Sequence, residues 1–115
     1  MKVIPRRRIR TDKFRLKWAE LQKLLASKET WALAVINADQ LLDEALKKKH
    51  CKGKSMGERL VSVQRELTDN DAVWFAHNLA KKILSEESKR LNQTEVKKSL
   101  LGVGKALRDL GVINE

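Results

Sequence analysis

Proline occurs once and glycine five times in the 115 residues of this chain, and tyrosine is absent. Because proline and glycine interrupt regular structure, their scarcity favours long helices over a succession of turns. The β-branched residues form no alternating run of the kind that predicts a strand. We therefore expect an all-α fold, and the length suits a single domain with one hydrophobic core.

Cysteine is equally scarce. Cys51 stands alone, which excludes an intramolecular disulfide and fits a reducing compartment. No apolar run approaches the ~20 residues that a membrane-spanning helix needs. The opening "MKVIPRRRIR" is basic but has no apolar segment after it, so it does not predict a secretory signal. These absences together predict a cytoplasmic protein.

Positive charge is abundant and unevenly distributed, with a net charge of +10. Residues 1–28 carry ten lysines and arginines against two acidic residues, whereas the rest of the chain carries fifteen against thirteen. An excess of this kind attracts polyanions such as RNA, or an anionic membrane surface. A plain solubility tail is the alternative interpretation.

Apolar periodicity predicts four long helices and one short one, packed as an antiparallel bundle. Residues 1–10 are expected to form a flexible basic arm, and residues 11–115 the helical domain. Ser55 with Glu58 is typical of a capping box, Thr30 and Thr94 are expected to cap helices, and Gly111 is expected to end the last one. The expected helices cover about 12–27, 30–49, a short stretch from 55, 70–87 and 94–110.

Several residues are of types found in metal, phosphate-binding or catalytic sites, but their spacing does not predict such a site. His50 and Cys51 have no second pair to complete the four ligands of a zinc site, and "GKS" at 53–55 lacks the earlier glycine of a phosphate-binding loop. We expect Asp39, Asp43 and Glu44 on the solvated face of a helix, not as an acid–base pair. No metal or cofactor is predicted, and the three tryptophans are expected to pack in the core.

A longer stretch of the sequence resembles a known protein family. From Trp31 to Ile113 the chain resembles a HEPN domain, most closely the small HEPN-like proteins of candidate-phyla bacteria such as Saccharibacteria. The matching pieces are "ALAVINADQLLDEALKKK" at 32–49, "CKGKSMGERL" at 51–60, "VWFAHNL" at 73–79 and "ALRDLGVI" at 106–113, with "FRLKWAELQKLL" at 14–25 resembling the helix that precedes the domain. The resemblance implies a HEPN-like four-helix bundle that forms a homodimer.

Active members of this family are ribonucleases with an arginine and, five residues later, a histidine. The histidine moves a proton and the arginine stabilises charge on the phosphate. Here the motif "HxLRNxxxH" aligns with "HNLAKKILS", which places Ala80, Lys81 and Ser85 where the family has Arg, Asn and His. His77 matches a position upstream of the catalytic histidine. The resemblance therefore implies a degenerate active site.

We expect a catalytically inactive HEPN-like protein that binds RNA or another polyanion, or a protein partner such as an antitoxin. One alternative is an active ribonuclease or toxin that uses His77 with Lys81. Another is a protein of the membrane surface or a scaffold. The residues expected to contact phosphate are Arg6, Arg7, Arg8, Arg10, Lys13, Arg15, Lys17, Lys81 and Lys82.

Overall fold

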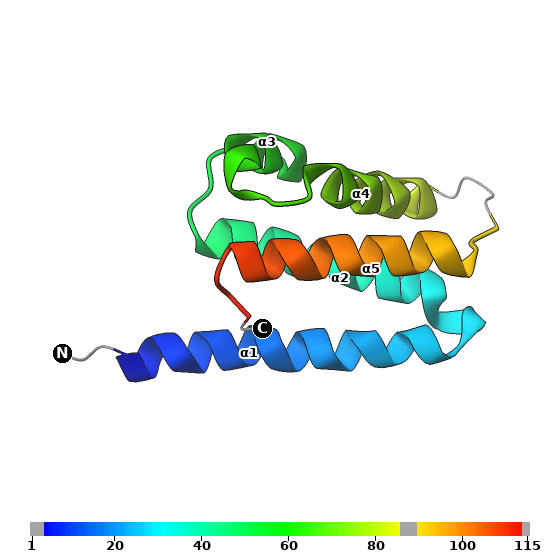
Figure 1. Cartoon of the computed structure of the whole chain (residues 1–115), viewed down its shortest axis with the longest axis horizontal. Coiled ribbons are helices and arrows are strands. Elements are labelled where there is room, and N and C mark those ends of the chain that lie inside the picture. The colour runs from blue at the N-terminus through cyan, green and yellow to red at the C-terminus, as the bar shows by residue number, and fades with distance from the viewer. Residues whose placement is uncertain (1–3, 86–89, 114–115) are drawn as a thin grey trace.

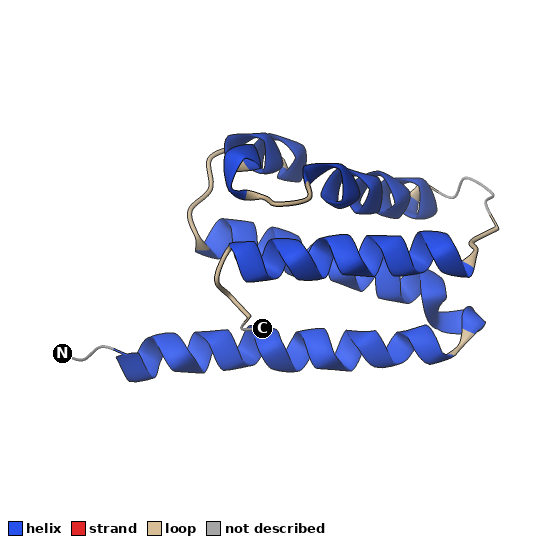
Figure 2. Ribbon diagram, viewed as in Figure 1, coloured by secondary structure: helices blue, strands red, loops and turns tan. Residues whose placement is uncertain are grey.

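The computed structural model describes residues 4–85 and 90–113, with side chains from Asp12 onward. The described residues are helices joined by loops and contain no strand, which confirms the all-α prediction (Figure 2). The elements in chain order are α1 (Ile4–Gln22), the 3-10 turns η1 (Lys23–Ala26) and η2 (Lys28–Thr30), α2 (Trp31–Lys48), α3 (Met56–Ser62), the 3-10 turn η3 (Gln64–Glu66), α4 (Asn70–Leu84) and α5 (Gln93–Asp109).

Helices α2, α4 and α5 pack against one another, and α1 packs chiefly on α2. Figure 1 shows α1 as a long helix along one side of the molecule, with the short α3 beside α4 on the opposite side. The buried residues of α2 recur every three or four positions and include Val35, Leu42 and Leu46. This spacing gives one apolar stripe that faces the other helices.

Small residues allow α4 and α5 to approach closely. A Cβ atom built at Gly102 would lie 2.8 Å from the backbone carbonyl and the Cβ of Ala72. Only glycine fits this close crossing without moving one helix. Gly111, at φ +77°, follows α5 as predicted, and Val112 and Ile113 then fold back into the core.

The predicted start of the first helix is wrong. α1 begins at Ile4, so residues 4–10 of the predicted arm continue the helix instead of preceding it. Residues 1–3 of that arm lie outside the described residues. α1 ends at Gln22, where the chain tightens into η1, whereas periodicity alone extends it to residue 27.

Side-chain caps define most of the other helix starts. Ser55 accepts from the backbone N–H of Glu58, which confirms the predicted cap, and Glu58 accepts from the N–H of Lys54. Thr30 stands at the N-cap position of α2 as predicted, but its side chain does not cap the helix, because its hydroxyl donates to the carbonyl of Leu24 at 2.6 Å. The predicted cap at Thr94 is wrong, since α5 is capped by Asn92, which accepts from the N–H of Glu95 at 2.8 Å.

Asp69 caps α4 by accepting from the backbone N–H of Ala72 at 3.1 Å, and Lys105 lies 3.3 Å from its other carboxylate oxygen. The bond from Ala72, followed by the contact with Lys105, holds the pKa of Asp69 below its ordinary value. The folded protein therefore favours the ionised form of the Asp69 carboxylate that caps α4.

Candidate polyanion-binding surface

Two basic segments that are distant in sequence meet at one end of the molecule. Lys13 and Lys17 on α1 lie across from Lys47 and Lys48 in the last turn of α2, around a pocket of about 310 Å³. Phe14 and a single acidic residue, Glu44, complete the described lining of this pocket. The antiparallel packing of α1 on α2 brings these lysines together, because the start of one helix lies beside the end of the other (Figure 1).

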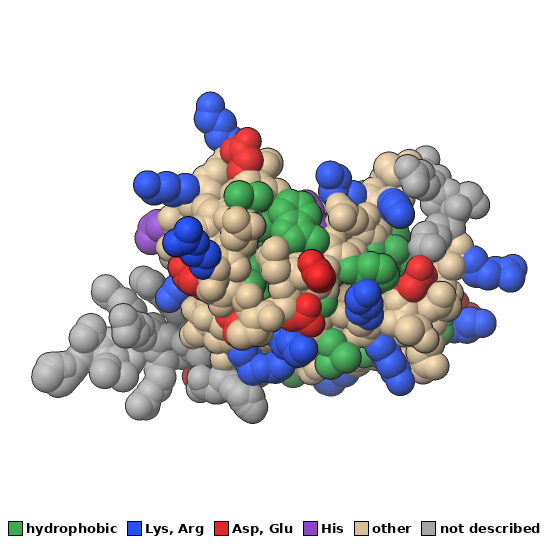
Figure 3. Space-filling view, turned by 45° about the horizontal axis from the view of Figure 1, so that its top comes forward, with side chains coloured by type: hydrophobic (Ala, Val, Ile, Leu, Met, Phe, Trp, Pro, Cys, Tyr) green, Lys and Arg blue, Asp and Glu red, His purple; other side chains and the backbone are tan. Residues whose placement is uncertain are grey.

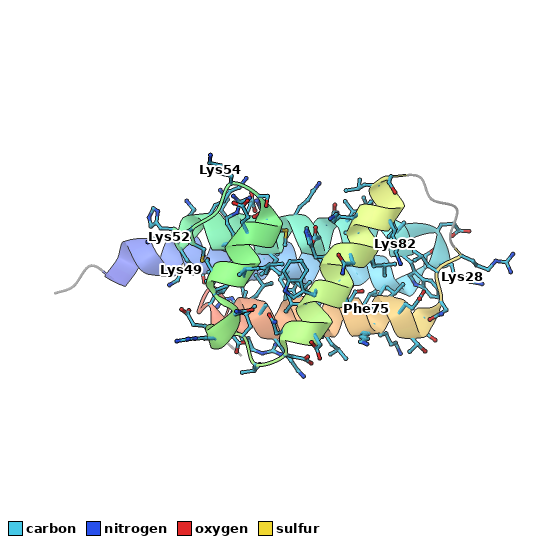
Figure 4. All side chains as sticks on the ribbon, turned by 90° about the horizontal axis from the view of Figure 1, so that it is seen from above. Lys28, Lys49, Lys52, Lys54, Phe75 and Lys82 are labelled. Carbon is cyan, nitrogen blue, oxygen red and sulfur yellow. The ribbon has the colours of Figure 1, made fainter. Side chains whose placement is uncertain are left out.

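The loop after α2 adds to this charge. The eight residues 47–54 read "KKKHCKGK", with five lysines and no acidic residue. Lys49, Lys52 and Lys54 are exposed, and Figure 4 shows them at the end of the molecule where α1 begins. We call this cluster the basic end, and its members are Lys13, Lys17, Lys47, Lys48, Lys49, Lys52 and Lys54.

Backbone geometry fixes how the loop leaves α2. His50 adopts φ 60°, and its N–H and that of Cys51 donate to carbonyls in the last turns of α2, at Lys47 and Leu46. This is the left-handed ending that closes a helix. Gly53 is required by its φ of +144°, since a Cβ there would lie 2.6 Å from the backbone nitrogen of Arg59. The loop therefore has one defined path.

Arg59 holds the loop in place. Its Nε and Nη2 donate to the two carboxylate oxygens of Asp43 at 2.9 and 3.0 Å, and its Nη1 donates to the carbonyl of Gly53 at 3.0 Å. The hydrogen bond with Asp43 raises the pKa of Arg59. Asp43 is half-buried, so its predicted place on the solvated face is only partly right, while Glu44 is exposed as expected. This bidentate pair connects α3 to α2 and orients the loop of residues 49–54, which we call the lysine loop.

Most lysines of the basic end are free to bind an anion. Lys17 lies 3.3 Å from Glu44, and Lys47 lies 3.7 Å from Asp43. Both lysines are largely exposed, and ion pairs of this kind contribute little and are easily exchanged. Among the described residues, the remaining members of the basic end have no ion pair. They are Lys13, Lys48, Lys49, Lys52 and Lys54.

The other predicted phosphate contacts are only partly brought together. Arg15 pairs with Asp12 on α1. Lys81 and Lys82 are exposed near the end of α4, and Figure 4 shows Lys82 at the opposite end of the molecule from the lysine loop. The side chains of Arg6, Arg7, Arg8 and Arg10 lie outside the described part of the chain.

The three positions aligned with the ribonuclease motif do not form a site. Ala80 is fully buried in the core, whereas Lys81 is exposed. Ser85 ends α4, where its hydroxyl donates to the carbonyl of Lys82 at 3.0 Å. These positions therefore face different surroundings.

His77 has a partner that the sequence did not predict. Its Nδ1 lies 3.1 and 3.2 Å from the carboxylate oxygens of Asp39, and each residue is only 8% exposed. The expectation that Asp39 lies on the solvated face is therefore wrong, because α2 turns this carboxylate toward α4. Burial raises the pKa of Asp39, although the bond from His77 acts in the opposite direction.

The aromatic rings lie against the core. Trp18, Trp31 and Trp74 pack half-buried against it, as the sequence predicted. The edge of Trp74 meets the ring of His77 with centroids 5.8 Å apart, and the ammonium of Lys98 lies 4.4 Å from the centroid of Phe75. Phosphate contact thus suits the exposed surface better than base stacking does.

Charge alone does not define the candidate surface. Lysine and arginine side chains also project at several other places on the face drawn in Figure 3. The basic end differs from those places because its lysines come from two packed helices and a loop with a fixed path. Burial also raises the pKa of Cys51, beside this loop, which disfavours a reactive thiolate there.

Within residues 4–85 and 90–113 there is no group of three or more His, Cys, Asp or Glu side chains placed to hold a metal ion. No helix in the described part of the chain has the length and apolar character to cross a membrane. No protein-family model matches the chain, and no curated protein or solved structure matches it either.

Proposed function

We propose that this chain is a catalytically inactive HEPN-like protein that binds the phosphate backbone of RNA through its basic end. The observation that carries the proposal is the meeting of α1 with the last turn of α2, from which the lysine loop continues. Together these segments gather five unpaired lysines of the described residues at one end of the molecule. The sequence pattern shared with HEPN domains supports the family, and the all-α architecture is compatible with it.

The helical repeat keeps the described lysines of α1 together. Lys13 and Lys17 are spaced i, i+4, which places them on one side of the helix, where both line the pocket shared with Lys47 and Lys48. Arginines and lysines that neutralise phosphates release counterions, and this release drives binding and makes it depend on salt.

The proposal is tested by the binding of fluorescently labelled RNA across a series of KCl concentrations. We expect log K to fall linearly with log [salt], with a slope of about 0.7 to 0.9 per phosphate contact. The triple variant Lys49→Gln, Lys52→Gln, Lys54→Gln should bind more weakly. The magnitude of its salt slope should fall by the amount expected for about two to three phosphate contacts. RNA binding that does not respond to salt would contradict the proposal.

A matched control separates the basic end from net charge. The triple variant Lys28→Gln, Lys81→Gln, Lys82→Gln removes the same charge at exposed positions elsewhere, and Figure 4 shows Lys28 and Lys82 away from the lysine loop. It should retain nearly the full slope. An equal loss in both variants would mean that the chain binds by its overall charge. Anionic vesicles in place of RNA test the membrane-surface alternative.

RNA cleavage is the second candidate function, and the contact between His77 and Asp39 is the observation that favours it. A carboxylate that accepts from Nδ1 holds an imidazole in one tautomer and orientation, as general bases require. The burial of both side chains favours a structural role instead. Cleavage of RNA by the wild type that disappears in His77→Ala, with the fold retained, would restore the ribonuclease interpretation.

A further inference from the structure

A groove of about 230 Å³ lies between α1 and α5, separate from the basic end. Trp18 of α1 and Leu25 of η1 form its apolar floor together with Leu100 and Gly104 of α5. Leu101, which is 65% exposed, forms part of its wall. We call it the α1–α5 groove. It combines a preformed apolar floor with a large apolar side chain that the described residues leave uncovered.

Gly104 makes this floor possible. A Cβ built at Gly104 would lie 2.9 Å from Cζ2 of Trp18, so a larger residue would push the indole away. With glycine in this position the indole lies close against the α5 backbone and stays half-buried. The tryptophan thus presents apolar surface toward the groove while it packs on the core.

The charge around the groove has one sign. Lys97 and Arg108 line it and are exposed. Among the described residues, neither cation has an ion pair and no acidic side chain lines the groove. Lys97, Leu101, Gly104 and Arg108 are spaced i, i+4, i+7 and i+11, which is one stripe of α5. Helical rise separates the two cations by roughly 16 Å along the axis. A cation therefore stands at each end of a short apolar track.

A larger groove, between α1 and α2, is not lined by charge of a single sign. It measures about 600 Å³ and contains the exposed side chains of Leu16 and Leu33. Its lining carries both signs, however, with Lys17 beside Glu20 and Glu44. Mixed charge does not select a partner of one sign, so this groove does not define an occupant.

We propose that the α1–α5 groove binds an amphipathic acidic helix of a partner protein. Apolar side chains at i, i+3 or i+4 and i+7 of that helix pack on Leu101 and the floor beside Trp18. Carboxylates at the two ends of the same three turns meet Lys97 and Arg108, because about eleven helical residues span the distance between these cations. Complementary charge also accelerates the encounter with a basic protein. This inference does not depend on RNA binding.

The test uses a labelled synthetic 16-residue peptide designed as an amphipathic helix, with leucines on one face and glutamates flanking them at both ends. Two control peptides replace the glutamates by glutamine or the leucines by serine. We expect saturable binding of the acidic peptide, and about tenfold weaker binding of each control peptide. NMR shifts should map to residues of the groove.

Surface variants that leave the core intact locate the site. Leu101→Ala and the double variant Lys97→Glu, Arg108→Glu should each weaken peptide binding by about tenfold or more. The matched controls are Leu84→Ala, at a similarly exposed leucine of α4, and the double variant Lys82→Glu, Arg65→Glu. The double control changes the charge by the same amount at exposed positions of α4 and η3 that do not line the groove. These controls should bind as the wild type does.

Three results would overturn the proposal: no saturable binding of the acidic peptide, equal effects of the groove variants and their controls, or NMR shifts confined to the basic end or the α1–α2 groove. The failure of RNA binding would leave this inference standing, because none of the residues that carry it belongs to the basic end.

Discussion

Nδ1 of His77 lies 3.1 Å from Oδ1 of Asp39, and this contact joins α4 to α2 inside the bundle. Both side chains are nearly inaccessible to solvent. A buried imidazole and a buried carboxyl group each need a partner, because an unsatisfied polar group in the interior is costly. The pair therefore satisfies two polar groups that the helix packing would otherwise isolate.

Removing one partner should destabilise the protein. Asp39→Ala leaves the buried Nδ1 of His77 without an acceptor, and we expect the free energy of unfolding to fall by about 1–3 kcal/mol. Asp39→Asn keeps an amide oxygen that can accept from Nδ1, so its loss should be clearly smaller. Urea denaturation of both variants at neutral pH measures the difference. Equal losses would show that the contact is not what stabilises this position.

The pH dependence of stability should show the raised pKa of Asp39. Because burial raises this pKa in the folded state, the folded protein keeps the proton at pH values where the unfolded chain has lost it. The contribution of Asp39 to the free energy of unfolding therefore falls as pH rises from its ordinary pKa of 3.8 through the folded value. The stability of the wild type relative to Asp39→Asn should decline over this window in urea titrations.

Asp69 provides the opposite control. Its pKa is lowered in the folded state by the bond from Ala72, so its contribution is present above its ordinary pKa of 3.8 and is lost as pH falls through the folded value. Relative to Asp69→Asn, the wild type should gain stability as pH rises at the acid end of the same titration. If the curves for the Asp39 and Asp69 variants change in the same direction with pH, one of the two assignments is wrong, and the sign of the slope shows which.

The sequence pattern and the structure assign the N-cap of α5 to different residues. Asn92 accepts from the N–H of Glu95, and Asn92→Ala should reduce stability by about 1 kcal/mol. Thr94, which the sequence pattern favoured as the cap, lies exposed inside the first turn, so Thr94→Ala should change stability by no more than about 0.5 kcal/mol. Thermal or urea unfolding of the two variants decides which residue begins the helix.

Two glycines should respond in opposite directions to alanine. Gly102→Ala places a methyl group 2.8 Å from the backbone of Ala72, and we expect a loss of about 1–3 kcal/mol from the strain between α4 and α5. Gly57→Ala meets only ordinary contact with Trp74 at 3.5 Å, so better helix propensity in α3 should give a gain of about 0.5 kcal/mol. If Gly102→Ala is as stable as the wild type, α4 and α5 can move apart without loss of stability and the expected strain is absent.

The sequence predicted the helices well where apolar spacing is regular. The interiors of α2, α4 and α5 and the glycine after α5 follow from the 3.6-residue period and the special conformation of glycine. The boundaries were less predictable. Thr94 and Asn92 both suit an N-cap, and only the path of the preceding loop determines which side chain can reach an N–H of the first turn.

The candidate surface was predicted in part. The basic stretch of α1 is visible in the sequence, but its meeting with Lys47 and Lys48 in the last turn of α2 depends on the antiparallel packing of α1 on α2. The "KKKHCKGK" stretch was itself a signal, since it contains no acidic residue. The pair of Asp39 and His77 was missed because the sequence does not give the rotation of α2 relative to α4. A polar residue flanked by apolar ones on α2 was the available sign of burial.

Helix α1 belongs to both proposed surfaces, yet it is attached chiefly to one neighbour, α2. Helices with few packing partners open at a lower free energy than the rest of a domain, so amide protons of α1 should exchange with solvent ahead of those in α2, α4 and α5. A ligand that binds only when α1 is packed on the bundle lowers the population of the open state by mass action. RNA on one face of α1 and a partner helix on another would therefore strengthen each other's binding without touching, with the docking of α1 as the shared equilibrium.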